Sequence, residues 1–193
     1  MVTEELGTQV YVTISKKHII VLKMPQTFGA FFLFNKLIFG THKKIDTMAT
    51  SVQFIHSYWA YLVLLIVLLA TLNALAGFFS KREYGAKDFR ISLFALIVTH
   101  IQLLIGLVLY FVSPLGLQNI TNLGMGEVMK NSNFRLYAVE HPFVMILTVV
   151  FITIGYSKHK KKLLSQGKFK TLAIFYTIAL VLMLSRIPWS QWF

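Results

Sequence analysis

Long apolar stretches separated by short charged segments dominate the pattern of this chain. Four of them approach the roughly 20 mostly apolar residues that a helix needs to cross a membrane, at residues 55–79, 91–112, 137–156 and 172–187. The fourth is the shortest. The pattern therefore predicts an all-α protein, an integral membrane bundle of four helices that run up and down.

Small residues at helical spacing indicate where these helices pack. Lipid provides no hydrophobic drive for helix association, so close approach depends on small side chains. The first stretch offers Ala70, Ala74 and Gly77, and the second offers Gly106 on the stripe Thr99, Gln102, Gly106 and Tyr110. We expect both sets to form packing faces.

The first 47 residues follow a different pattern. Residues 10–15 and 19–22 are short and β-like, and two polar residues interrupt the apolar run 28–39. No clean membrane span can be drawn through this run. The segment also lacks the ordered charged, apolar and small-residue regions of a secretory signal.

A compact start at Met48, reading Met-Ala-Thr-Ser, directly precedes the first apolar stretch. We interpret residues 1–47 as an N-terminal extension produced by a misplaced start codon. The alternative is a disordered or interfacial segment of the native protein. In either case the four-helix membrane domain is expected over residues 48–193.

Composition supports a bilayer as the solvent. The chain is 56% hydrophobic and 13% charged, about half the usual charge of a soluble domain. It has no cysteine, which excludes disulfides, iron–sulfur clusters and covalent c-type haem. Glycine-rich phosphate loops, nucleophile elbows and H-E-x-x-H pairs are also absent from the sequence.

The net charge of +12 is explained better by membrane orientation than by nucleic acid. Basic residues concentrate in the loops 80–90 and 157–171, whereas the middle loop holds only Lys130 and Arg135. Even spans place both basic loops on one side, and the positive-inside rule makes that side cytoplasmic. We expect a multi-pass protein of the bacterial inner membrane with an external C-terminus, in contact with membrane lipid and without a nucleic-acid partner.

Three histidines lie in apolar stretches, where an imidazole needs a partner. At about 1.5 Å of rise per residue, His56 and His141 are near the same external level, whereas His100 is near mid-depth. The two axial ligands of one haem need similar depth. We therefore expect His56 and His141 to ligate the iron of a haem b. His100 is a candidate for a second site, a quinone site or a proton relay, or is a packed structural residue.

Further candidates occur at the same external level. Arg135 and Arg186 suit the carboxylates of haem propionates, and Glu140 is positioned to hydrogen-bond the His141 imidazole. The alternatives are an Arg135–Glu140 salt bridge and an Arg186 side chain that snorkels to headgroups. His159 lies in a lysine run and is expected to be solvated.

Several short motifs from residue 56 onward resemble the small bacterial four-helix membrane proteins labelled cytochrome b. They are HS at 56–57 with YLVLL at 61–65, THIQLLIG at 99–106 with YFVSP at 110–114, VEH at 139–141 with IG at 154–155 and SK at 157–158, and IPW at 187–189. The resemblance implies a b-type haem and a role near respiratory electron transfer. Residues 1–47 have no counterpart in it.

Three functions remain open at this stage. The first is an electron carrier that binds non-covalent haem b and passes electrons between quinone and a respiratory-complex partner, with a homodimer as the alternative assembly. The second is a non-enzymatic membrane subunit or scaffold of a larger complex, with structural histidines. The third, a metal or proton transporter, is less favoured because the chain shows no pair of broken helices.

Overall fold

The computed structural model describes residues 10–15, 18–22 and 26–191, with side chains from 47 to 190. It divides the chain into two units, Met1–Ile45 and Asp46–Phe193. In the first unit, strands β1 (Val10–Ser15) and β2 (His18–Leu22) form an antiparallel hairpin. The two β-like segments are therefore confirmed as strands. That residues 1–47 are an extension stays a prediction.

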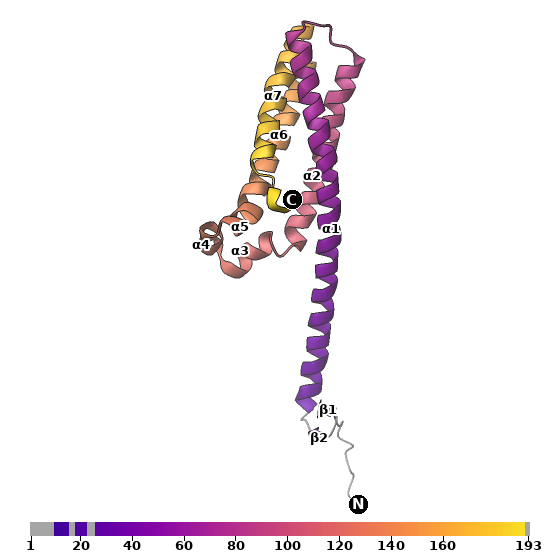
Figure 1. Cartoon of the computed structure of the whole chain (residues 1–193), viewed down its shortest axis with the longest axis vertical. Coiled ribbons are helices and arrows are strands. Elements are labelled where there is room, and N and C mark those ends of the chain that lie inside the picture. The colour runs from indigo at the N-terminus through magenta and orange to yellow at the C-terminus, as the bar shows by residue number, and fades with distance from the viewer. Residues whose placement is uncertain (1–9, 16–17, 23–25, 192–193) are drawn as a thin grey trace, which may run out of the picture. The chain divides into compact units, whose positions relative to one another are not determined.

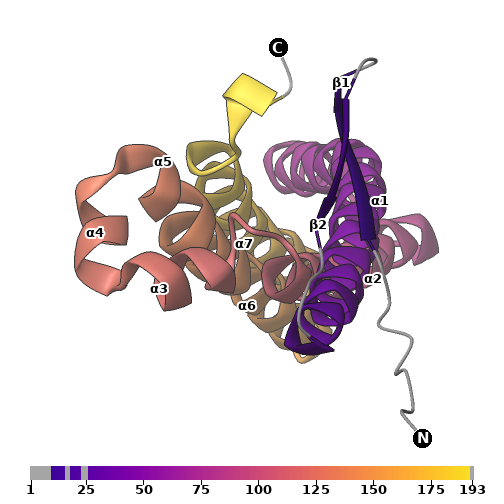
Figure 2. The same ribbon diagram turned by 90° about the horizontal axis from the view of Figure 1, so that it is seen from below.

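The second unit is helical throughout its described residues (Figures 1 and 2). Its four long helices are α1 (Gln26–Phe79), which begins in the first unit, α2 (Ala86–Val112), α6 (His141–Lys160) and α7 (Ser165–Ser185). Between α2 and α6 lie α3 (Leu117–Leu123), α4 (Met125–Lys130), α5 (Ser132–Arg135) and one π-helical turn, η1 (Leu136–Glu140). A 3-10 turn, η2 (Trp189–Gln191), follows α7.

The predicted all-α membrane bundle is confirmed. Four helical segments are long and apolar enough to cross a membrane: Thr47–Phe79, Ala86–Leu123, Ser132–Lys160 and Ser165–Ser185. The α1–α2 and α6–α7 connections lie at one end of the bundle, and α3, α4 and α5 form an arc at the other (Figures 1 and 2). The long helices therefore run alternately up and down.

Several helix ends differ from the prediction. Helix α1 begins at Gln26, so residues 28–39 are helical, while the candidate membrane span on this helix begins at Thr47. Isolated polar residues interrupt a membrane span but not a helix, and no proline occurs between Gln26 and Phe79. Helix α7 begins seven residues before the predicted start at 172 and ends at Ser185.

The start of α2 and the end of α6 also extend beyond the predicted apolar stretches. Helix α2 begins at Ala86, and α6 continues to Lys160, because polar residues at a membrane boundary extend a helix into water. Residues 137–140, expected at the start of the third helix, belong to η1. Pro142 lies at the first positions of α6, where its missing N–H breaks no helical hydrogen bond.

Small residues bring the helices together as predicted. Ala70 and Ala74 of α1 are buried with 3% and 1% of their surface exposed. A side chain at Gly77 would overlap the ring of Phe169 on α7. Likewise, a Cβ at Gly155 of α6 would lie 2.6 Å from the Cβ of Phe175 on α7. These contacts build the core at close helix–helix separation.

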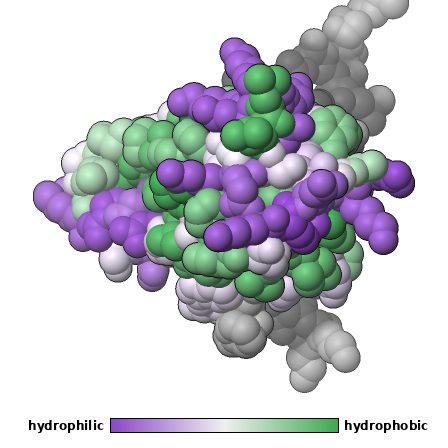
Figure 3. Space-filling view, turned by 90° about the horizontal axis from the view of Figure 1, so that it is seen from above, coloured by the Kyte–Doolittle hydropathy of each residue, from purple (hydrophilic) through white to green (hydrophobic). Residues whose placement is uncertain are grey.

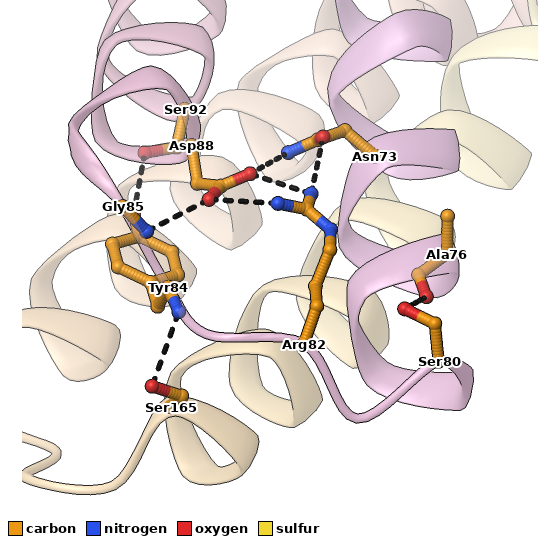
Figure 4. Close-up of polar contacts among 9 residues, drawn as sticks. All are labelled: Asn73, Ala76, Ser80, Arg82, Tyr84, Gly85, Asp88, Ser92 and Ser165. Atoms are coloured by element: carbon orange, nitrogen blue, oxygen red, sulfur yellow. Dashed lines mark hydrogen bonds and ion pairs between the residues drawn. The ribbon is translucent and has the colours of Figure 1, made fainter.

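A polar network closes the turn between α1 and α2 (Figure 4). The Asp88 carboxylate is 3% exposed and accepts two hydrogen bonds from Arg82, at 2.6 and 3.0 Å. It also accepts one from Asn73 and one from the Gly85 N–H, each at 2.9 Å. The bidentate guanidinium pair orients the turn, because a fork of two parallel bonds has a defined geometry.

The same turn is joined to the fourth helix. The Tyr84 N–H donates to the Ser165 hydroxyl at the start of α7, at 3.1 Å. The Tyr84 hydroxyl lies 3.5 Å from that of Ser92. Burial raises the pKa of Tyr84 above its ordinary value, so this hydroxyl is neutral at physiological pH. We call this end of the bundle, with the 80–85 and 161–164 connections, the basic end (Figure 3).

His159 is not solvated, contrary to the prediction. Only 1% of it is exposed, and its ring centroid lies 5.1, 5.7 and 6.2 Å from those of Tyr156, Tyr84 and Phe89. Lys158 and Lys160 on either side are exposed. His159 follows the buried Ile152 by seven residues, two helical turns, so it faces the core while its neighbours face water.

Candidate cofactor site

The structure brings His56 of α1 and His141 of α6 together. Their ring centroids are 6.2 Å apart, with the ring planes 76° from each other. The prediction that these two histidines share one level of the bundle is therefore confirmed. That these two histidines bind a haem iron stays a prediction.

Both imidazoles already contact the protein. The Gln102 amide nitrogen lies 3.3 and 3.4 Å from the two ring nitrogens of His56, and it donates to the His56 backbone carbonyl at 3.0 Å. His141 Nδ1 lies 2.8 Å from the Arg186 carbonyl oxygen. A carbonyl only accepts, so Nδ1 of His141 carries the proton and Nε2 keeps its lone pair.

A cavity of about 480 Å³ opens beside these rings, a size typical of small-molecule and cofactor sites. Its lining is mostly apolar and comes from α1, α2, α6, the segment between α2 and α6, and the end of α7 with the residues that follow it. Polar groups in the lining include His56, His141, Thr99, Gln102, Tyr110 and Tyr137. Gln102 Oε1 is buried and has no hydrogen-bond partner among the described residues. The cavity therefore offers two imidazoles and an acceptor to an occupant.

Glycine at position 106 makes room for the first imidazole. A Cβ there would lie 3.1 Å from Cε1 and 3.5 Å from Nδ1 of His56. The shorter distance is tighter than an ordinary van der Waals contact, so a larger residue would displace the ring. Glycine thus sets the position of His56 against α2.

Three charged residues form one cluster beside His141. Glu140 pairs with Arg135 at 2.8 Å and with Arg186 at 3.3 Å. The expectation that Glu140 would hydrogen-bond the His141 ring was wrong, because Glu140 binds the two arginines and the Arg186 carbonyl contacts the ring. The alternative of an Arg135–Glu140 salt bridge is confirmed. Two cations and one anion leave this cluster with a net positive charge.

His100 lies outside the cavity lining. Its Nδ1 donates to the Leu96 carbonyl at 2.7 Å, and its Nε2 lies 3.4 Å from the Thr153 hydroxyl of α6. Both ring nitrogens thus have contacts within the bundle. The structure separates His100 from the other two histidines and favours its interpretation as a packed, hydrogen-bonded residue.

Sequence reasoning missed part of the site. All four residues of the stripe that was expected to pack against other helices line the cavity: Thr99, Gln102, Gly106 and Tyr110. Thr99 is nevertheless almost fully buried, with 2% of its surface exposed. The Tyr110 hydroxyl donates to the Ala138 carbonyl of η1 at 3.2 Å. A glutamine in the middle of a membrane span was the signal that this face is more than a packing surface.

The π-helical turn η1, directly before His141, was also missed. Such turns insert one extra residue into a helix and occur often at functional sites. The residues at 136–140 form no pattern that predicts a π-helical turn.

The chain matches no protein-family model, and searches of curated proteins and of solved structures find no match. Within the described residues, no three His, Asp or Glu side chains gather into a group suited to a metal ion.

Proposed function

We propose that this membrane bundle binds a non-covalent haem b through His56 and His141 and carries electrons in or near a respiratory chain. The observation that supports it most is the meeting of these two imidazoles, from α1 and α6, at one cavity. The cytochrome b-like motifs of the sequence point to the same chemistry.

His56 and His141 are the residues that would hold the iron of such a group. Their ring centroids lie 6.2 Å apart, close enough for both imidazoles to contact one molecule in the cavity. His141 offers the lone pair of Nε2, because Nδ1 is engaged by the Arg186 carbonyl.

The surrounding residues suit the remainder of such a group. A porphyrin supplies the other metal donors itself and, when bound, the one-electron redox chemistry. The apolar lining would exclude water and thereby favour the less charged oxidation state. Arg135, Glu140 and Arg186 do not line the cavity, but they lie beside His141 and carry a net positive charge, which would favour the carboxylate groups of a ligand that extends beyond the lining.

The proposal also covers the orientation of the bundle in the membrane and its electron partners. Basic residues flank the 80–85 and 161–164 connections, so the positive-inside rule places this end in the cytoplasm of a bacterial cell and the candidate site near the outer face of the inner membrane. A quinone and a respiratory-complex subunit are the proposed electron partners, with a homodimer as the alternative assembly. Membrane lipid surrounds the helices.

Absorption spectroscopy of the purified full-length chain tests the proposal. We expect a reduced-minus-oxidised difference spectrum of b type and a pyridine haemochrome that yields haem in a fixed ratio to protein. His56→Ala or His141→Ala should lower that ratio at least tenfold. His100→Gln is the matched control, because His100 is also an intramembrane histidine but lies outside the cavity lining.

Two results would count against haem binding. One is a colourless protein from haem-replete cells; the other is an equal loss of haem in all three variants. Circular dichroism in detergent separates loss of haem from loss of fold.

A scaffold subunit is the second candidate function. It is favoured by one observation: both histidines already have contacts with the protein, His56 with Gln102 and His141 with the Arg186 carbonyl. This function predicts a cofactor-free protein that tolerates His56→Gln and that co-purifies with a larger complex.

A further inference from the structure

A second hollow lies between α1 and α2, near the basic end of the bundle. It is an open groove of about 640 Å³. Its walls are mostly apolar and include Leu69, Leu72 and Ala76 of α1 and Phe94 of α2. All four of these side chains are exposed. In a bilayer this groove faces the acyl chains of one leaflet.

Arg90 is the charged residue in the lining of this groove. It is exposed, and it makes no hydrogen bond or ion pair with any residue that the structure describes. Of the other basic side chains at this turn, Arg82 is held by Asp88, and Lys81 and Lys87 do not line the groove. Asn73, which also lines the groove, has its amide engaged by Asp88 and Arg82. Arg90 therefore keeps its donors available for a ligand.

The dimensions of the groove match one half of a bilayer. Its α1 wall runs from Ile66 to Ala76, and ten residues of helix rise about 15 Å at 1.5 Å per residue. This is half of a hydrocarbon core of roughly 30 Å. Arg90 is one turn into α2, close enough to the boundary for its long side chain to reach the headgroup layer.

From these observations we propose that the groove between α1 and α2 is a binding site for one anionic phospholipid. An acyl chain lies along the apolar wall, and the guanidinium of Arg90 binds the phosphate and the anionic headgroup. Arg90 is a cation that no described residue of the chain neutralises, so it favours an anionic lipid over a zwitterionic one. The inference does not rest on haem binding.

Native mass spectrometry of the detergent-purified full chain tests the site. The protein is titrated with phosphatidylglycerol or with phosphatidylcholine of the same acyl chains. We expect one molecule of phosphatidylglycerol to bind about fivefold more tightly, the ratio that a single cation near an anionic headgroup gives. Arg90→Gln should remove this preference. Ala76→Phe, which fills the groove, should remove binding of that lipid molecule.

Lys170→Gln is the matched control. Lys170 is an exposed cation about as far into α7 as Arg90 is into α2, and it does not line the groove. The variant should keep the wild-type preference. If Phe at position 76 prevents folding, Ala76→Leu replaces it as the groove-filling change.

Three outcomes would overturn the proposal. One is an equal loss of preference in Arg90→Gln and Lys170→Gln, which would indicate a diffuse effect of net charge. Another is wild-type lipid binding by the folded groove-filling variant. The third is a dimer that Ala76→Phe disrupts with no preference for phosphatidylglycerol, which would make the occupant a second copy of the chain.

Discussion

At the scale of single residues, the candidate site depends on a position without a side chain as well as on the side chains that line it. Gly106 has no side chain, and the space beside it holds the imidazole of His56. Gln102, one turn earlier on α2, contacts the same imidazole. Two positions of α2 therefore determine where a residue of α1 points.

Gly106→Ala is predicted to lower haem content severalfold and to shift the absorption bands of the haem that remains. The new methyl group would lie 3.1 Å from His56 Cε1, so the ring must shift by a few tenths of an ångström. Gly126→Ala is the control, because a Cβ there meets nothing within 4 Å. Haem quantitation and difference spectra measure the effect. Unchanged spectra in both variants would contradict His56 ligation.

At the scale of elements, the turn between α1 and α2 joins three helices. Its carboxylate, Asp88, is almost fully buried and receives four hydrogen bonds. The backbone of Tyr84 extends the connection to α7. This arrangement holds the basic end together while the cavity occupies the other end of the bundle.

Asp88→Ala is predicted to lower the free energy of unfolding by about 1–3 kcal/mol, since it removes the buried acceptor of four partly buried hydrogen bonds from Arg82, Asn73 and Gly85. Partial exposure of Arg82, 40% for its side chain, keeps the loss below that of a fully buried pair. Denaturation in detergent micelles gives the measurement. Glu127→Ala breaks an ion pair in which both side chains are more than 60% exposed, and it should change stability by less than about 1 kcal/mol.

At the scale of the whole molecule, the lengths of the apolar stretches predicted the four-helix architecture. They did not predict where each helix ends or which polar groups pair. Hydropathy located all four spans because the bilayer demands continuous apolar length. It missed the start of α7 at Ser165, where polar residues continue a helix outside the apolar layer. Counting residues along the helices placed His56 and His141 at one level, because helical rise is regular.

The polar partners could not be predicted in the same way. Glu140 neighbours His141 in sequence, yet the acceptor for the ring is the carbonyl of Arg186, the residue that follows α7. Such pairings depend on how helices rotate about their axes, and neither hydropathy nor spacing determines that rotation. His159 shows the converse: its burial follows from a seven-residue spacing to Ile152 that the lysines around it obscured.

Orientation across the membrane is testable because the chain has no cysteine. Leu163→Cys adds a thiol to the α6–α7 connection, where the native side chain is 96% exposed. Asn122→Cys adds one to α3 at the opposite end. In intact cells with a permeable outer membrane, an impermeant maleimide should label Cys at 122 and not at 163; inside-out vesicles should reverse the pattern. Labelling of 163 in intact cells would contradict the proposed orientation.

Arg186 makes two contacts with another part of the chain, through its backbone carbonyl to His141 of α6 and through its guanidinium to Glu140 of η1. Fraying of the chain just beyond α7 therefore breaks a neutral bond and an ionic one in the same event. Without that carbonyl, the imidazole proton is free to exchange between the two ring nitrogens. A displacement of the chain that follows α7 would in this way change the tautomer of the His141 imidazole on α6.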